Sequence, residues 1–149
     1  MSLRITAVDL ENAAISATWL DLLDHYARDP MGGGVGLSAY ARTHLVDELK
    51  RLPTFHGALA WRGEMAVGLI NCFAGFSTFA ARPLLNIHDI VVHADARRQG
   101  IGQALLQWAE RRARQLGCCK LTLEILSGNT RAMASYARAG YAPYVLDPA

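Results

Sequence analysis

The stretch from Ile87 to Gln103 constrains the fold most, because it reads as a buried strand, a short polar loop and the start of a helix. Its β-branched run is typical of a strand covered on both faces and comprises Ile87, Ile90, Val91 and Val92. Gly100 and Gly102 then stand directly before an amphipathic pattern of helical period. The segment therefore predicts a strand–loop–helix unit of an α/β domain.

The polar loop of this unit has the character of a phosphate site. A helix start carries free backbone N–H groups and partial positive charge, and glycines let a ligand approach the backbone closely. Arginines beside it add charge-assisted contacts. The residues that we expect to hold a pyrophosphate-bearing cofactor are Arg97, Arg98, Gln99, Gly100, Ile101, Gly102 and Gln103.

Two blocks of the chain resemble one known family. Arg97-x-x-Gly100-x-Gly102 resembles the Gln/Arg-x-x-Gly-x-Gly/Ala signature of the GNAT superfamily of acyl-CoA-dependent N-acyltransferases. Downstream, a second block is similar to the family's Asn-x-x-Ala-x-x-x-Tyr helix, which closes on a Gly-aromatic pair; it contains Asn129, Ala132, Tyr136, Gly140 and Tyr141. The two blocks span 84–144 in the order that the family has them.

The resemblance implies a fold. We expect one α/β (α+β) domain over residues 1–149, with a mixed, mostly antiparallel sheet of about six to seven strands and about four flanking helices. The cofactor would lie between two splayed parallel strands. The tail after Gly140 is short for the family, which leaves open whether a final strand is missing or is lent by a partner subunit.

Periodicity and turn signals place the individual elements. Asp9 and Ser38 are the expected caps of two early helices, and the loops are Met31–Gly36, a flexible connection or lid, and Phe76–Arg82. Two later helices are expected over Ile101–Leu116, closed by Gly117, and Thr130–Ala139. The expected strands are Leu3–Val8, His56–Trp61, Met65–Ala74, Leu84–Val92, Lys120–Leu126 and Tyr141–Leu146.

Composition excludes several classes of protein. A formal charge of +2 is too balanced for a nucleic-acid partner, and 52% hydrophobic residues exclude a disordered chain. No apolar run is long enough for a membrane span, and no signal peptide is visible, so we expect a cytoplasmic protein. Three cysteines without Cys-x-x-Cys spacing predict neither disulfides nor a metal site, and we expect small core residues in Cys72, Cys118 and Cys119.

The resemblance also implies roles at the site. The backbone of Ile90, Val91 and Val92 would align the pantetheine arm of acetyl-CoA as an added strand, and a backbone N–H near Ile90 would polarise the thioester. Asn129 would help bind the cofactor or only cap its helix. Tyr136 would protonate the departing thiolate; its alternative role is that of a core tyrosine with a satisfied hydroxyl.

The identity of the base that deprotonates the acceptor stays open between His88, Asp89, Glu124 and water. His88 and Asp89 are adjacent on the strand, so we expect them to point to opposite faces, with only one facing the acceptor amine. His88 is a plausible base in place of a glutamate that some family members have there; its alternative role is that of a hydrogen-bonded core histidine. Asp89 is assigned a structural role, and Glu124 is the weaker base candidate on the neighbouring strand.

Other functions stay open at this point. Gly100-Ile101-Gly102, with Glu124 ending a strand further on, imitates a dinucleotide-binding fingerprint, although Leu105 stands at the third glycine position. An NAD-type oxidoreductase domain is therefore the alternative, and a non-catalytic acyl-CoA sensor is another. The predicted activity is direct transfer of an acetyl group from acetyl-CoA to a small-molecule primary amine, and the resemblance implies a homodimer.

Overall fold

A computed structural model describes residues 2–29, 33–124 and 130–142, and their strands form one five-stranded sheet in the order β1-β2-β3-β4-β5. The first four strands pair antiparallel, and β5 runs parallel to β4. The sheet is mixed and mostly antiparallel as expected, with fewer strands than expected among these residues. The strands are β1 (Leu3–Ala7), β2 (Phe55–Arg62), β3 (Met65–Ser77), β4 (Arg82–Val92) and β5 (Leu121–Leu123).

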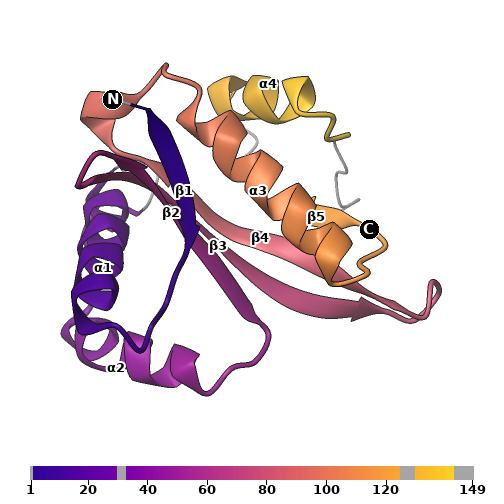
Figure 1. Ribbon diagram of the computed structural model, residues 1–149, viewed down its shortest axis with the longest axis horizontal. Helices are drawn as coiled ribbons and strands as arrows, with labels where there is room; N and C mark the ends of the chain where they lie inside the picture. The colour runs from indigo at the N-terminus through magenta and orange to yellow at the C-terminus, as the bar shows by residue number, and fades with distance from the viewer. Residues whose placement is uncertain (1, 30–32, 125–129, 143–149) are drawn as a thin grey trace.

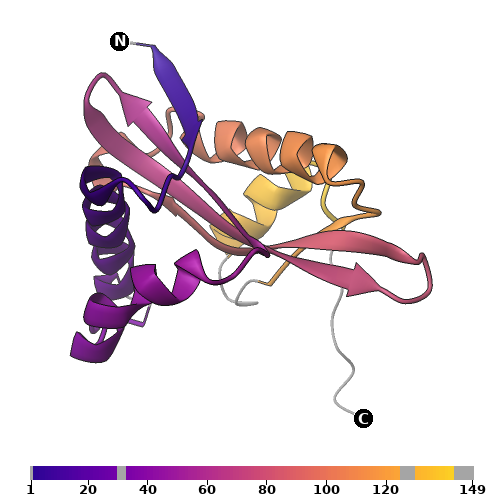
Figure 2. The ribbon, with the colours of Figure 1, turned by 60° about the horizontal axis from the view of Figure 1, so that its bottom comes forward.

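Helices cover both faces of this sheet. Helices α1 (Ala13–Arg28) and α2 (Ala39–Lys50) lie on one face, and α3 (Ile101–Gln115) lies on the other, with α4 (Thr130–Arg138) beside it (Figures 1 and 2). A short 3-10 turn, η2 (Ala94–Ala96), follows β4. Within the described residues, no helix is long and apolar enough to cross a lipid bilayer.

The mostly antiparallel order excludes the dinucleotide-binding fold that the glycine spacing imitates. That fold needs a doubly wound, mostly parallel sheet, whereas β4 and β5 are the one parallel pair among the described strands. The loop that contains Gly100 and Gly102, called the glycine loop below, nevertheless leads from β4 into α3, as its sequence predicts.

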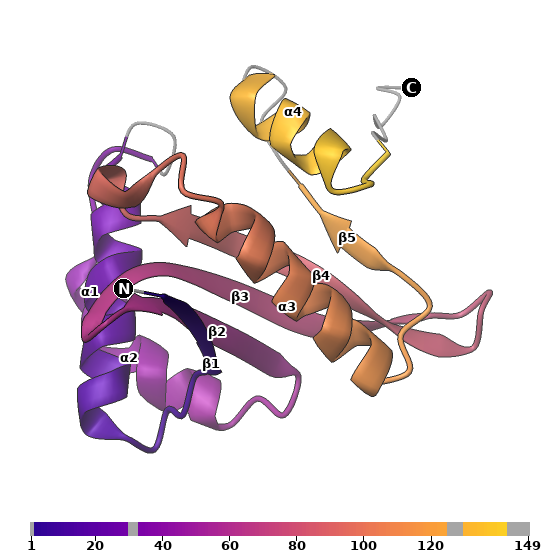
Figure 3. The same ribbon diagram turned by 45° about the horizontal axis from the view of Figure 1, so that its top comes forward.

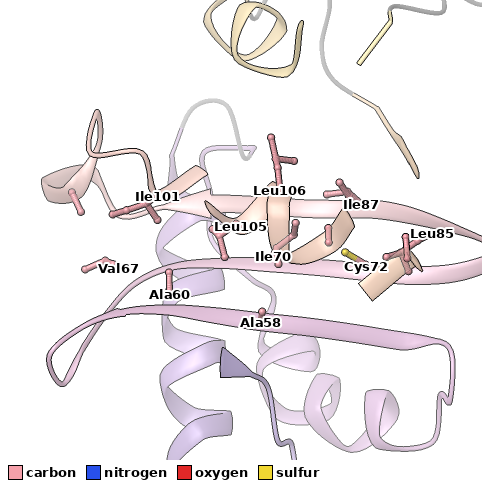
Figure 4. Close-up of a cluster of buried hydrophobic side chains, with 13 residues drawn as sticks. Ala58, Ala60, Val67, Ile70, Cys72, Leu85, Ile87, Ile101, Leu105 and Leu106 are labelled. Carbon is pink, nitrogen blue, oxygen red and sulfur yellow. The ribbon is translucent and has the colours of Figure 1, made fainter. Parts of the chain in front are cut away.

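Each helical layer has its own hydrophobic core. On the α3 side, Ile101, Leu105 and Leu106 belong to one buried cluster with Ile70 and Ile87 of the sheet (Figure 4). On the α1 side the core consists of Trp19, Leu22, Leu23, Leu49, Leu59, Trp61, Leu69 and Val91. Because β3 and β4 supply side chains to both cores, the central strands read as nearly continuous apolar runs.

Helix caps follow the sequence in α2 and differ from it in α1. Ser38 caps α2 as expected, since its Oγ accepts a hydrogen bond from Ala41 N at 3.1 Å. Helix α1 is capped by Asn12 instead of Asp9, because Asn12 Oδ1 accepts from Ile15 N at 3.1 Å. The Asp9 carboxylate accepts instead from Glu11 N at 3.0 Å. Gly117 follows α3 with φ 73°, as its role as a helix stop requires.

The expected loop over 76–82 is shorter than predicted, because Phe76 and Ser77 belong to β3 and Arg82 belongs to β4. Ser77 pairs with Arg82, so the β3–β4 hairpin turns within 78–81. Its end extends beyond the helices (Figure 1), with Phe76 and Phe79 exposed. The apolar/polar alternation that marks a half-buried strand is absent from this segment, which explains why it reads as a loop.

At the C-terminal side, β5 and α4 are confirmed in place, with β5 shorter than expected. Gly140 has φ 97° and follows α4 as predicted. Tyr141 and Ala142 are not in a strand, and the rest of the expected strand Tyr141–Leu146 lies outside the described residues.

A tight contact of Gly68 fixes the distance between β3 and the start of α3. A Cβ at Gly68 would lie 2.9 Å from Val91 O and 3.0 Å from Ile101 Cγ2. We predict that Gly68→Ala lowers the free energy of unfolding by about 1–3 kcal/mol, as overpacking of a core does. Urea denaturation measures it.

Gly102→Ala is the matched control for this substitution. Among the described residues, a Cβ at Gly102 would have only Val92 Cγ2 within 4 Å, at 3.9 Å. Alanine also has a higher helix propensity than glycine. The control should be as stable as the native protein or slightly more stable. Equal stability of Gly68→Ala and the native protein would contradict this account of the contact.

Asp24 holds α1, α2 and the segment between them together. Its buried carboxylate accepts from Leu37 N at 2.8 Å and pairs with Arg28 at 2.9 Å and Arg42 at 2.8 Å. The backbone N–H of Leu37 and then the two arginines lower the pKa of Asp24 below its usual 3.8, against the opposing effect of burial.

This lowered pKa predicts a pH-dependent contribution to stability. The contribution is present above the ordinary carboxyl pKa and is lost as the pH falls through the lower folded value. Asp24→Asn should therefore destabilise the protein at pH 7, and its deficit should shrink below pH ~4. Denaturation curves at the two pH values test this, and a deficit that is the same at both would contradict it.

Candidate active site

The site begins where β4 and β5 separate. The parallel pairing covers Leu85 to Ile87 on β4 and ends there, so the β4 backbone from His88 to Val92 lacks a strand partner on that side among the described residues. Figure 3 shows β5 leaving β4 in the direction of α4. An unpaired strand edge offers backbone N–H and C=O groups to an extended ligand.

The start of α3 lies at the end of this open edge. The first helical hydrogen bond runs from Ala104 N to Gly100 O at 3.1 Å, so the N–H groups of Ile101, Gly102 and Gln103 precede it and have no acceptor within the helix. Gly100 has φ 77°, a conformation that glycine adopts without strain. No acidic side chain occupies the first turn of α3. These features together favour an anion.

A cleft of about 790 Å³ joins the strand edge to the start of α3. Nearly all the predicted cofactor residues line it: Ile90, Val91, Val92, Arg97, Arg98, Gly100, Ile101, Gly102, Gln103 and Tyr136. Gln99 does not line it, and its Oε1 accepts from Arg62 Nε at 3.2 Å. Asn129 lies outside the described residues.

Arg97 and Gln103 line the cleft with side chains that have protein partners. Arg97 pairs with Asp29 at 3.2 Å. Gln103 Nε2 donates to Ser135 O at 3.1 Å and to Ser135 Oγ at 3.2 Å, which ties α3 to α4. Any phosphate contact of Gln103 would thus come from its backbone N–H, as the sequence predicted.

A β-bulge at His88 overturns the expectation that His88 and Asp89 point to opposite faces. Asn71 pairs with Asp89 and Cys72 pairs with Ile87, so His88 is an extra residue between them. The His88 ring lies edge-on to Phe73 with centroids 5.5 Å apart, and Asp89 Oδ2 accepts from Asn71 Nδ2 at 3.0 Å. Both side chains therefore contact residues that belong to or touch the core on the α1 side.

The environment of His88 also excludes the alternative of a hydrogen-bonded core histidine. Its side chain is exposed, lines the cleft, and forms no hydrogen bond with the described part of the chain. Glu124 follows β5, is exposed, and lines the same cleft. His88, Asp89 and Glu124 thus line the same cleft.

Tyr136 lines the cleft from α4. Its ring is half-buried and packs edge-on to Tyr141, with centroids 6.0 Å apart. Burial, and then the neighbouring Tyr26, raise the pKa of Tyr136 to about 12. The phenol therefore stays protonated at neutral pH and can donate a proton.

The cysteines stand apart from this chemistry. Burial and then Asp89 raise the pKa of Cys72 to about 12, so its thiol stays protonated in the core. Cys118 is half-buried, and Cys119 is exposed, which corrects the expectation of a core residue. None of the three lines the cleft. In the described residues no three His, Cys, Asp or Glu side chains gather as a metal site.

Helix α1 contributes residues to the cleft that its sequence pattern does not indicate. Tyr26 and Asp29 line the cleft, and the His25 ring stacks on His93, centroids 4.5 Å apart, just after β4. Tyr26 is half-buried and stands at helical spacing from the buried Trp19 and Leu22 of α1. Its position at the site depends on how α1 crosses β4, which periodicity alone does not give.

Known proteins share both the sequence pattern and the fold. Residues 19–141 match the acetyltransferase (GNAT) family. An aminoalkylphosphonate N-acetyltransferase of Salmonella typhimurium is 36% identical over 89 residues, which are 60% of this chain and 58% of that protein. A streptothricin acetyltransferase of Streptomyces lavendulae is 38% identical over 91 residues, or 59% of this chain and 48% of that protein.

The chain thus spans about half the length of these two curated relatives. The fold is shared with a crystal structure described as a transcriptional regulator of Bacillus halodurans C-125, with a TM-score of 0.84 at 20% identity. That match covers 98% of this chain and 97% of the other. Because the family match takes in β2 to α4 together with the glycine loop, the chain belongs to the acetyltransferase (GNAT) family.

Proposed function

We propose that this protein transfers an acetyl group from acetyl-CoA to a primary amine. One observation carries the proposal: an unpaired strand edge leads directly to a helix start with free N–H groups, and a protonated phenol lines the same cleft. Family membership supports it. The names of the two relatives support a small-molecule acceptor. A homodimer and a cytoplasmic location stay predictions.

The cleft has the features that acetyl-CoA needs. Backbone groups of Ile90, Val91 and Val92 would hold the pantetheine arm, since amide groups pair with a strand edge as another strand does. The N–H groups of Ile101, Gly102 and Gln103 would hold the pyrophosphate, with Arg98 adding charge. When bound there, acetyl-CoA supplies a thioester carbonyl to the amine.

The residues of the chain account for the protons of the reaction. His88 takes one proton from the ammonium of the acceptor and later releases it to solvent. As the C–N bond forms and the C–S bond breaks, Tyr136 Oη donates its proton to the leaving sulfur. The acetylated nitrogen then loses a second proton, which passes through solvent to the Tyr136 phenolate and restores the phenol. The products are the amide, the free thiol and one proton.

Titration calorimetry with acetyl-CoA, run beside NAD, tests the cofactor. We predict saturable binding of acetyl-CoA with a micromolar Kd, or roughly −8 kcal/mol, and none of NAD at the same concentrations. A preference for NAD would contradict the proposal. Binding without acetylation across an amine panel that includes 2-aminoethylphosphonate and benzylamine would indicate an acyl-CoA sensor instead.

Replacing Tyr136 tests the proton donor. Tyr136→Phe keeps the ring and its packing on Tyr141 but removes the hydroxyl, so kcat should fall about tenfold or more with the Kd for acetyl-CoA nearly unchanged. Because the pKa of Tyr136 is raised to about 12, its proton should not limit the native rate between pH ~8 and ~10. Unchanged turnover in the variant would remove Tyr136 from the mechanism.

A further inference from the structure

The Asp89 side chain is half-buried and has no cationic partner among the described residues. Its Oδ2 accepts from Asn71 Nδ2 at 3.0 Å, and no ion pair of the described residues includes it. Carboxylates that leave water are normally paired with a cation or fully hydrogen-bonded. Asp89 lines the cleft, so a ligand in the cleft can reach the carboxylate.

Two buried side chains fix the direction of this carboxylate. Trp19 Nε1 donates to Asn71 Oδ1 at 2.8 Å, and the Trp19 and Asn71 residues are 1% and 2% exposed. An indole N–H can only donate, so it assigns the oxygen of the Asn71 amide to Trp19 and the NH₂ group to Asp89. The chain Trp19–Asn71–Asp89 therefore holds an acceptor group of defined orientation at the wall of the cleft.

The Asp89 carboxylate shares the cleft with Tyr26, His88 and Tyr136. Burial, and then Asp89 and Asp29, raise the pKa of Tyr26, so the Tyr26 phenol lies within the field of Asp89. Tyr26 in turn contributes to the raised pKa of Tyr136, the proposed proton donor. Asp89 is adjacent to His88 and lines the same cleft as Tyr136, and the bulge puts the Asp89 and His88 side chains on the α1 side.

We propose that the Asp89 carboxylate binds the ammonium group of the acceptor, and that Asn71 and Trp19 are positioning residues for it. This inference rests on the proposed function and adds the group that recognises the protonated amine. An ion pair with Asp89 places the ammonium beside His88, which takes the proton. Asp89 itself exchanges no proton in this step.

A matched pair of probes tests the ion pair. Benzylamine and benzyl alcohol have similar shapes, and only benzylamine is a cation at pH 7. In calorimetric titrations of the full chain saturated with CoA, we expect the native protein to bind benzylamine about tenfold or more tightly than the alcohol. Asp89→Asn should bring the ratio of the two Kd values close to one. Asp89→Glu, which keeps the charge, should restore part of it.

Trp19→Phe tests the positioning chain. It keeps an aromatic ring in the core and removes the indole N–H, so the Asn71 amide loses the partner that orients it. We expect the preference for benzylamine, measured as the ratio of the two Kd values, to fall about threefold. That change corresponds to the net free energy of one neutral hydrogen bond. An unchanged preference in this variant would overturn the roles of Asn71 and Trp19.

Two controls separate this inference from the function on which it rests. Asp21→Asn makes the same charge change on an α1 side chain that is 74% exposed and outside the cleft, and it should leave the ratio unchanged. Acetyl-CoA titrations of every variant report folding and cofactor binding separately. Failure of the native protein to bind acetyl-CoA would overturn the proposed function.

The role of Asp89 fails under different outcomes. Intact acetyl-CoA binding with an unchanged ratio in Asp89→Asn would overturn it. So would a ratio near one in the native protein, or a ratio that Glu124→Gln abolishes and Asp89→Asn does not.

Discussion

The site depends on the separation of β4 from β5 after Ile87. Up to that residue the two strands satisfy each other's backbone groups, and beyond it β4 keeps a partner only in β3 among the described strands. The bulge at His88 lies at the same place, because β4 carries one residue more than β3 there. The bulge and the end of the β4–β5 pairing thus coincide, and two polar side chains, His88 and Asp89, line the cleft that begins there.

The groups that we propose to bind the cofactor and the acceptor come from different layers of the fold. The α3 side provides the helix start and, through Gln103, holds α4 with Tyr136. The α1 side provides Tyr26 and, through Trp19 and Asn71, the orientation of Asp89. Because β4 lies between the two layers, its bulged residues face the point where both sets of groups meet.

Much of this arrangement is predictable from local sequence. The strand before the glycine loop, the start of α3 at Ile101 and the end of α4 before Gly140 follow from β-branched runs, glycines and helical periodicity. The bulge is not predictable in this way, since alternation assumes that pairing stays in register. The cleft-facing position of Asp89 and the hydrogen bond from Trp19 to Asn71, 52 residues apart, depend on tertiary packing. The cap at Asn12 was missed because Asp9 is an equally good capping type.

The proposed function places acetyl-CoA in the gap between β4 and β5. A crystal structure of the protein with CoA tests it most directly. This account predicts the pantetheine arm hydrogen-bonded to the backbone of Ile90–Val92 and the pyrophosphate within hydrogen-bonding distance of the N–H groups of Ile101–Gln103. CoA bound elsewhere, or a β5 that pairs with β4 as far as Val92 and closes the gap, would contradict it.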